Sequence, residues 1–260
     1  PAFAYEIAAI IKHGINEMYV KNKDVINYIA LYNENYSMPE IPEGVDEKDI
    51  LSGMYHYKTF QPNEEDLIEI TVELLGSGPI MQQVLRAAEI LVEKGIACRV
   101  WSVTSYGELY REAAELERLD RLSPQLEEGS IAHGVEKIMR PRIFNSRIYQ
   151  SLGDTDVINN PLVPEDWVCV AASDNIRAVP ELIRPWVPQG KFIVLGTDGF
   201  GRSDTRSSLR RFFEVDAEHI ALAAISGLAD ATGSAKDWAM FESAKKEFGI
   251  DVEREDIASL

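Results

Sequence analysis

The segment Leu195-Gly196-Thr197-Asp198-Gly199-Phe200-Gly201-Arg202-Ser203-Asp204-Thr205 places three glycines within six residues. The apolar residues Phe192–Leu195 that lead into it are typical of a strand, and a charged helix is expected to follow through Arg210-Arg211. A strand that ends in a glycine-rich loop and leads directly into a helix is the connection of an α/β unit. This segment therefore predicts the fold class.

The same alternation extends through most of the chain. Apolar runs predict strands, and apolar residues at three- and four-residue spacings predict helices. The expected strands are Leu67–Leu75, Ala97–Val103, Trp167–Ala172 and Phe192–Leu195. The expected helices are Ile80–Lys94, Tyr106–Leu122, Asn175–Trp186, Ala217–Ala231 and Ala235–Phe248. Strands that alternate with helices predict an α/β domain with a mainly parallel sheet flanked by helices.

The N-terminal residues show half of another α/β unit. Residues 1–19 have helical periodicity, and Val25–Leu31 is rich in β-branched residues and predicts a strand. We expect a helix-strand remnant of a second α/β domain over residues 1–38, whose other strands would lie upstream of Pro1. Residues 39–66 are predicted as a linker, interrupted by a short helix at Asp46–Ser52 and a strand at Met54–Phe60. Residues 67–260 form the main domain.

Composition excludes several classes of partner. The net charge of −17 over 260 residues repels phosphate backbones and argues against nucleic-acid binding. No apolar run approaches the ~20 residues of a membrane helix, and the N-terminus does not resemble a secretory signal.

Cys98 and Cys169 both fall within apolar strand patterns. Two buried thiols are typical of a reducing compartment, and a cytoplasmic location is expected.

The sequence contains few motifs that could carry chemistry. Gly76-Ser77-Gly78 lies between a strand and a helix, where backbone amides can bind a phosphate, but Met81 stands where a dinucleotide fingerprint needs a third glycine. A structural turn is the favoured interpretation and a nucleotide site the alternative. The histidines show no metal-ligand spacing, so no metal ligand is predicted; they are His13, His56, His133 and His219.

Two polar segments are candidate site residues. Asn33, Glu34, Asn35 and Tyr36 follow the predicted Val25–Leu31 strand, and ligands of parallel sheets gather beyond the carboxyl ends of strands. They are predicted to line a substrate entrance, with a capping turn as the alternative.

The glycine-rich loop contains the other candidates. Asp198 is expected to cap or hydrogen-bond neighbouring backbone, and Arg202 to pair with Asp204 or with another subunit. A structural or interface role is favoured over contact with substrate or cofactor.

Several blocks, in the right order and over nearly the whole chain, resemble one known family. The sequence is similar to the C-terminal part of the homodimeric, thiamine-dependent pyruvate dehydrogenases, the first component of the 2-oxo-acid dehydrogenase complex. The blocks are Pro1–Glu6, Leu31–Pro39, Leu74–Gly78, Val100–Ser105, Ala171–Asp174, Ile183–Pro188 and the glycine-rich loop. Leu119 and Ser123 depart from the family pattern, and residues 124–164 form a longer segment than usual.

The resemblance implies a parent function. Residues 1–38 would be the tail of the domain that binds the aminopyrimidine, and residues 67–260 a transketolase-like C-terminal domain. The parent, a homodimer, would decarboxylate pyruvate on thiamine diphosphate with Mg²⁺ and pass the acetyl unit to the lipoyl group of an acyltransferase component.

The resemblance also implies that the catalytic and cofactor-binding residues lie upstream of Pro1. The family's Mg²⁺ motif is Gly-Asp-Gly followed by a distant Asn, and Gly153-Asp154-Thr155 with Asn159 and Asn160 matches it only by accident. This chain alone is expected to be inactive and to serve dimerisation or assembly. The alternative is a stand-alone doubly wound domain that acts as an interaction or small-ligand-binding module.

Overall fold

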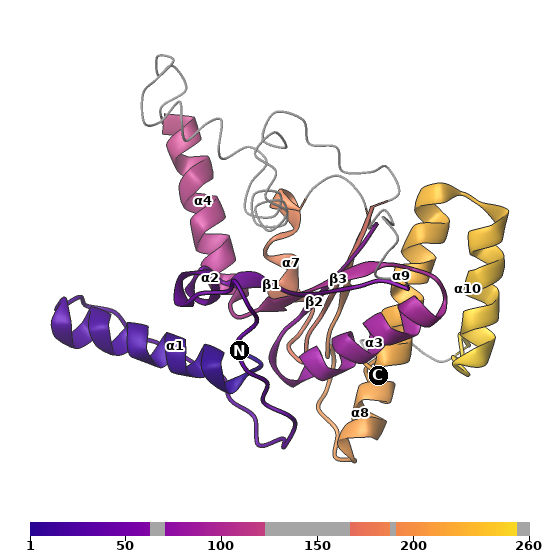
Figure 1. The fold of residues 1–260 in the computed structure, drawn as a ribbon, viewed down its shortest axis with the longest axis horizontal. Helices are drawn as coiled ribbons and strands as arrows, with labels where there is room; N and C mark the ends of the chain where they lie inside the picture. Colours follow the sequence, from indigo (N-terminus) through magenta and orange to yellow (C-terminus); the bar gives the residue numbers. More distant parts are fainter. Residues whose placement is uncertain (63–70, 123–166, 188–190, 254–260) are drawn as a thin grey trace.

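The computed structural model describes residues 1–62, 71–122, 167–187 and 191–253. At its centre is a five-stranded sheet in the order β1-β3-β2-β4-β5 (Figure 1). Four of these strands are parallel, and β1 runs antiparallel to β3 at the edge. The strands are β1 Met54–Phe60, β2 Val72–Gly76, β3 Cys98–Val103, β4 Val168–Ala172 and β5 Lys191–Leu195. The prediction of a mainly parallel sheet is confirmed.

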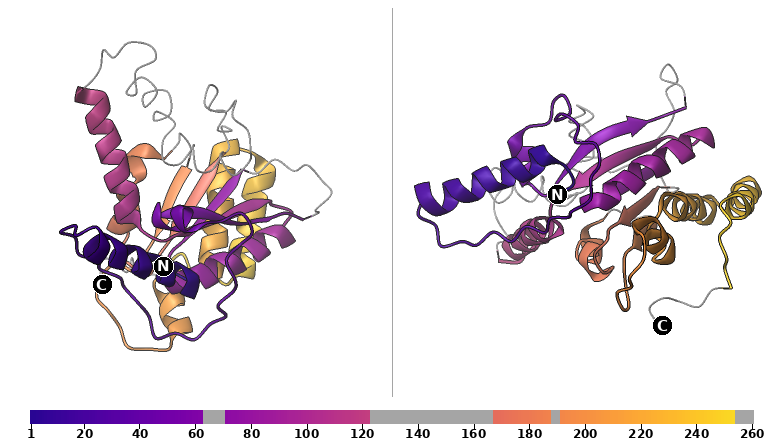
Figure 2. Two further views of the ribbon diagram at one scale, coloured as in Figure 1. Left: turned by 60° about the vertical axis from the view of Figure 1, so that its left-hand side comes forward. Right: turned by 90° about the horizontal axis from the view of Figure 1, so that it is seen from below.

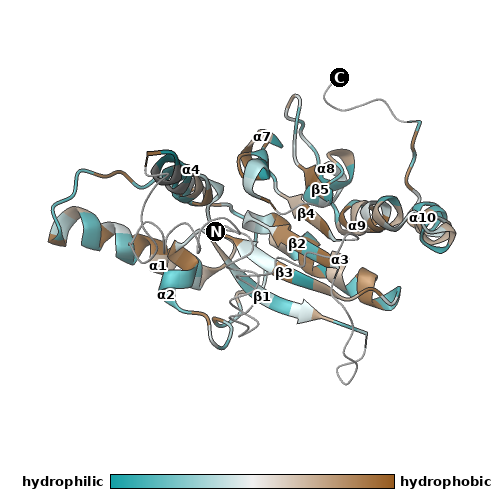
Figure 3. Cartoon of the chain, turned by 90° about the horizontal axis from the view of Figure 1, so that it is seen from above, coloured by the Kyte–Doolittle hydropathy of each residue, from teal (hydrophilic) through white to brown (hydrophobic). Residues whose placement is uncertain are grey.

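Helices cover both faces of this sheet (Figures 2 and 3). The helices α3 (Met81–Glu93) and α9 (Ala217–Thr232) pack on one face, with α10 (Ala235–Glu247) outside α9. The opposite face carries α4 (Tyr106–Leu122) and α7 (Ala178–Glu181). Because successive strand residues point to opposite faces, Leu74 joins the core under α3 and α9, whereas Leu75 joins the core under α4. The thiols of Cys98 and Cys169 are buried, one in each core, as predicted.

The predicted strand at Val25–Leu31 is wrong. This segment has no regular secondary structure, and Ile26 and Tyr28 are 94% and 93% exposed. β-branched and aromatic residues favour a strand only where a neighbouring strand supplies hydrogen bonds and packing. All five strands of the described sheet pair with one another, so this segment lacks a partner strand within the described residues.

The predicted helix Asn175–Trp186 is also wrong in extent. The structure has two short helical pieces, α7 and the 3₁₀ turn Arg184–Trp186. Pro180 and Pro185 lack a backbone N–H and obstruct the preceding turn, so a continuous helix cannot form here.

The N-terminal helix packs against the edge of the sheet. The helix α1 (Ala4–Ile15) continues into a π-helical turn at Asn16–Val20 and contacts the short helix α2 (Glu47–Leu51). Both helices were expected. The edge strand β1 arises from the predicted linker and pairs with β3. The division into residues 1–38, 39–66 and 67–260 stays a prediction.

Some predicted features lie outside the described residues. They are part of the strand Leu67–Leu75, the segment 124–164 with its Gly153–Asn160 motif, His133, and the departures from the family pattern at Ser123. Among the helices that the structure describes, none is long and apolar enough to cross a membrane.

The start of α9 predicts a pH dependence of stability. Asp216 caps this helix: its Oδ1 accepts a hydrogen bond from the His219 backbone N–H at 3.0 Å and contacts the imidazole Nδ1. Arg211 Nη1 lies 3.3 Å from the other oxygen. Burial acts to raise the pKa of Asp216, but these contacts outweigh it and the pKa lies below its ordinary value.

We expect Asp216→Ala to lower the free energy of unfolding by about 2 kcal/mol at pH 7, because a cap and charge-assisted hydrogen bonds are lost. A carboxyl group whose pKa is depressed in the folded state stabilises the fold at pH values above its unfolded-state pKa of about 3.9. This stabilisation is lost as the pH falls through the folded-state pKa. The loss should therefore shrink below pH 4 in urea titrations. Ser234→Ala, which removes the cap of α10, is the control and should lower the free energy of unfolding equally at pH 7 and pH 3. An equal effect of Asp216→Ala at pH 7 and pH 3 would contradict this.

Candidate functional site

The carboxyl ends of three parallel strands meet at one edge of the sheet. The strands β2, β4 and β5 lead into the turns Ser77-Gly78, Ser173–Asn175 and Gly196–Asp198. Between β2 and β4 the chain changes direction, since β3 lies on the other side of β2. Ligands of open α/β sheets bind at such switch points. This edge is therefore the candidate functional site.

The three turns are connected by hydrogen bonds. Ser77 Oγ lies 2.9 Å from Ser173 Oγ, and both residues are buried. Thr197 Oγ1 donates to the Asp174 carbonyl oxygen at 2.6 Å, and the Thr197 N–H to the Asn175 carbonyl oxygen at 2.9 Å. These bonds hold the ends of β2, β4 and β5 in fixed relative positions.

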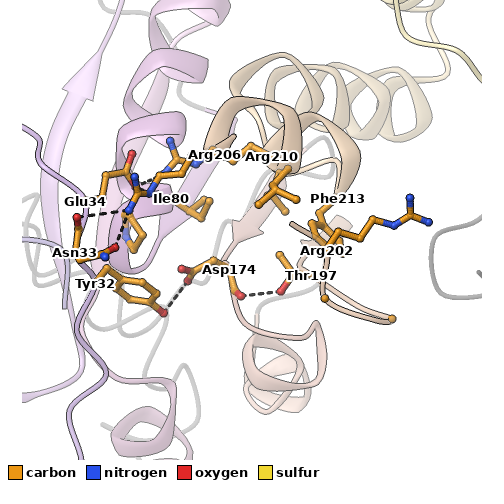
Figure 4. Close-up of a pocket in the computed structure, with 15 residues that line it drawn as sticks. Tyr32, Asn33, Glu34, Ile80, Asp174, Thr197, Arg202, Arg206, Arg210 and Phe213 are labelled. Carbon is orange, nitrogen blue, oxygen red and sulfur yellow. Dashed lines mark hydrogen bonds and ion pairs between the residues drawn. The ribbon is translucent and has the colours of Figure 1, made fainter. Parts of the chain in front are cut away.

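A cavity of about 300 Å³ opens beside these turns (Figure 4). Its apolar residues are Pro79, Ile80, Leu209, Phe213 and Val215. Its polar side chains come from the segment after α1, from the strand ends and from α8 (Arg206–Phe212); they are Tyr32, Asn33, Glu34, Asp174, Thr197, Arg202, Arg206 and Arg210. An apolar interior with a few polar groups is typical of a small-molecule site.

A second cavity of about 530 Å³ adjoins this one, and Tyr32 and Asp174 line both cavities. The Tyr32 hydroxyl donates to Asp174 Oδ1 at 3.1 Å. Burial raises the pKa of Tyr32 to about 12, and the Asp174 charge adds to the effect. Burial also raises the pKa of Asp174, while the Tyr32 hydroxyl opposes that rise.

The same tyrosine occupies the space over the Gly76–Gly78 turn. Gly78 has φ +53°, and a Cβ built on it would lie 3.1 Å from Tyr32 Cε2. Only glycine adopts this conformation without strain. A side chain at this position would also meet the Tyr32 ring, so Gly78 has a structural reason to be glycine.

Two of the four predicted entrance residues line the cavity. Asn33 and Glu34 contact arginines of α8. Asn35 is exposed, and the Tyr36 hydroxyl donates to the Ala2 carbonyl oxygen, away from the cavity lining. The capping-turn alternative is not observed at Asn33 or Glu34, whose side chains contact α8. Their role in a substrate entrance stays a prediction.

The loop candidates take different positions. Asp198 accepts a hydrogen bond from the Arg177 N–H at 2.9 Å and pairs with its guanidinium, so its backbone partner lies 21 residues away rather than next to it. The Arg202 guanidinium lies 4.1 Å from the centre of the Phe212 ring. The predicted pairing of Arg202 with Asp204 is wrong, because Asp204 accepts from the Thr205 N–H instead. Pairing with another subunit stays a prediction.

Sequence reasoning missed four residues of this site: Tyr32, Asp174, Arg206 and Arg210. The arginines gave a usable signal, since they lie four residues apart and so share one face of a helix in a strongly acidic chain. No sequence pattern indicated that Tyr32 would lie beside Asp174, 142 residues away.

The site does not fit a divalent metal. Within the described ranges there is no group of three or more His, Cys, Asp or Glu side chains that could hold one.

His56, on β1, is held neutral, because burial and the nearby Arg99 lower its pKa to about 4.

Comparison with known proteins identifies the family. Residues 53–216 match the transketolase-like TK C-terminal domain. The chain is 38% identical to the pyruvate dehydrogenase E1 component of Cupriavidus necator, over 96% of this chain and 25% of that protein. It is 40% identical to that of Mycolicibacterium smegmatis, over 88% and 22% respectively. A solved transketolase from Leishmania mexicana is 13% identical with a TM-score of 0.40, over 72% of this chain and 20% of that one.

The family match and the two sequence similarities to pyruvate dehydrogenase E1 components confirm the predicted resemblance to the pyruvate dehydrogenases. The chain spans about a quarter of the length of the curated relatives that it matches. Since the family match covers more than half of its residues, the chain belongs to the transketolase-like C-terminal domain family.

Proposed function

We propose that the chain is the C-terminal part of a pyruvate dehydrogenase E1 component. The parent would decarboxylate pyruvate on thiamine diphosphate and Mg²⁺ and pass the acetyl unit to a lipoyl group of an acyltransferase component. The observation that carries the proposal is the 38–40% identity to proteins of that name over 88% or more of this chain.

Within this function the chain has a supporting role. The described residues offer no fitting ligand set for a Mg²⁺ ion, so no step of the cofactor's chemistry is assigned to them. Their contribution is to hold the Asn33–Tyr36 segment against the carboxyl edge of the sheet, and to supply dimer surface. A cytoplasmic location belongs to the same proposal and rests on the two free, buried thiols.

The 260-residue chain is expected neither to bind thiamine diphosphate nor to decarboxylate pyruvate. Calorimetry with thiamine diphosphate and Mg²⁺ should give no binding heat, and carbon dioxide release from pyruvate should stay at the level of buffer. The full-length protein is the positive control and should do both. Micromolar cofactor affinity of the 260-residue chain, or an inactive full-length protein, would contradict the proposal.

The role in assembly needs its own measurement. If the chain supplies dimer surface, light scattering over a range of concentrations should show self-association. A monomer at every concentration would count against this role and leave the parent activity unaffected.

A further inference from the structure

We propose that Arg210 is a positioning residue that holds the Asn33-Glu34 turn at the carboxyl edge of the sheet and thereby fixes the substrate entrance. The inference rests on the proposed function, and it names the groups through which the C-terminal domain would act on the reaction. Arg210 would touch no reacting atom; it would act through Glu34.

Two arginines of α8 contact the turn (Figure 4). Arg210 Nη2 donates to Glu34 Oε2. Arg206 Nη2 donates to Asn33 Oδ1 at 2.7 Å, and its Nε lies 3.8 Å from Glu34 Oε2. Both guanidiniums therefore converge on two adjacent residues that are far from them in sequence.

The two contacts differ in burial. The side chains of Arg210 and Glu34 are 15% and 17% exposed, whereas that of Arg206 is 53% exposed. A charge-assisted hydrogen bond is stronger when it is shielded from water, and exposed ion pairs contribute little. Arg210 is therefore the principal anchor and Arg206 a secondary one.

The helix that carries these arginines is itself fixed. Thr205 caps α8 by accepting from the Ser208 N–H. Arg211, next to Arg210, donates through Nη2 to the carbonyl oxygens of Phe248 and Gly249 at 2.7 and 2.9 Å. The guanidinium of Arg210 thus projects from an element that is anchored on both sides.

The turn has no comparable support from its own backbone. The preceding Val25–Leu31 segment forms no strand and is largely exposed. Within the described part of the chain, side chains connect residues 32–36 to the rest of the fold, at Tyr32, Asn33, Glu34 and Tyr36. Loss of the Glu34 contact should leave the turn held at Tyr32 and Tyr36 and by the more exposed Arg206–Asn33 hydrogen bond.

Local charge supports an attractive role for this helix. Residues 202–211 contain four arginines and one acidic residue, in a chain with a net charge of −17. Burial raises the pKa of Asp174, and the nearby Arg210 charge is one of the effects that oppose this rise. Arg210 thus acts on carboxylates from two parts of the chain, and removing it would leave Glu34 with only the exposed Arg206 as a cation.

The first test is limited proteolysis of the 260-residue chain, in which a glutamate-specific protease cleaves after Glu34 only when this residue is released from α8. Removing one charge-assisted hydrogen bond should shift the docking equilibrium by about tenfold or more. Arg210→Gln should therefore raise the rate of cleavage after Glu34 by about tenfold, and Arg210→Lys by less. Arg118→Gln, at an exposed position of α4, is the matched control. An unchanged cleavage rate in Arg210→Gln would overturn the proposal.

The second test is kinetic and uses the full-length protein. If binding requires the docked turn, the KM for pyruvate should rise by the factor lost in docking, about tenfold, while kcat changes by less than about threefold. Glu34→Gln should have a similar effect, and the double variant should be no worse than either single one. Additive effects, or an equal loss of kcat in all variants, would overturn the positioning role.

The two tests separate the two proposals. A full-length protein with no pyruvate decarboxylation would end the proposed function, while limited proteolysis would still decide whether Arg210 holds the turn.

Discussion

Arg99→Met is expected to lower the free energy of unfolding by about 3 to 5 kcal/mol at pH 7, because it leaves an unpaired carboxylate in the core under α4. Glu73 on β2 is completely buried, and Arg99 on β3 is 5% exposed and directly opposite it in the parallel register. Arg99 Nε donates to Glu73 Oε1 at 2.8 Å, and the Trp101 indole N–H donates to Oε2 at 2.7 Å.

The loss should grow as the pH rises. Burial raises the pKa of Glu73, and the Arg99 guanidinium opposes that rise. Without Arg99 the folded-state pKa moves further above the unfolded value of about 4.3. A group with a raised folded pKa destabilises the fold increasingly as the pH climbs above its unfolded value, so the loss in Arg99→Met should be smaller at pH 5 than at pH 8.

Urea titration at several pH values measures this effect. The double variant Arg99→Met/Glu73→Leu should recover most of the lost stability, because it removes the unpaired charge as well. Arg111→Met is the control: its partner Glu108 and Arg111 itself are both exposed, and the change should stay within about 0.5 kcal/mol. A double variant as unstable as Arg99→Met would show that the arginine matters through packing rather than through its charge.

Glu6→Ala is expected to cost about 3 to 4 kcal/mol and to release α1 from the sheet. Glu6 is completely buried and accepts four hydrogen bonds. Its Oε2 accepts from the N–H groups of Ala2 and Phe3, and its Oε1 accepts from Tyr55 at 2.7 Å and Ser102 at 2.6 Å. Removal of the carboxylate leaves these donors in an apolar environment, at about 1 to 3 kcal/mol for each one that water does not reach.

The comparison with glutamine shows why a carboxylate is required here. Glu6→Gln keeps the shape of the side chain but replaces one acceptor by an NH₂ group that meets donors, so it should recover only part of the loss. The control is Glu47→Gln on the neighbouring helix α2. Glu47 forms an exposed ion pair with Lys12 of α1, so this substitution should hardly change the free energy of unfolding.

Hydrogen exchange distinguishes local from global unfolding in these variants. In Glu6→Ala, fast exchange in residues 4–15 with protection retained in β2 and β4 would mean that α1 detaches alone. Retained protection of α1 would contradict the assigned role of Glu6.

Both expectations depend on polar groups that a sequence-based search does not select. Glu73 and Arg99 lie within apolar strand patterns, and a charged residue there gives no indication of its partner. The parallel register of β2 and β3 places Glu73 and Arg99 side by side. The surrounding fold then buries both side chains away from water.

The candidate site shows the same limit. The strand-end rule pointed to the carboxyl edge of a sheet, and Asn33 and Glu34 line a cavity at such an edge. The rule was applied through a predicted strand at Val25–Leu31 that the structure lacks. The side chains that complete the site, Tyr32 with Asp174 and Glu34 with Arg210, pair across 142 and 176 residues.

The sequence by itself determined the α/β class, the strands and helices with strong local periodicity, the burial of both cysteines and the family. These follow from hydrophobic spacing and glycine positions, which act over a few residues. Tertiary structure alone decided that Val25–Leu31 remains unpaired, that Glu6 and Glu73 are buried acceptors, and that α8 holds the Asn33-Glu34 turn. A strand needs a neighbour and a buried charge needs a partner, and in this chain the folded sheet determines where each of them lies.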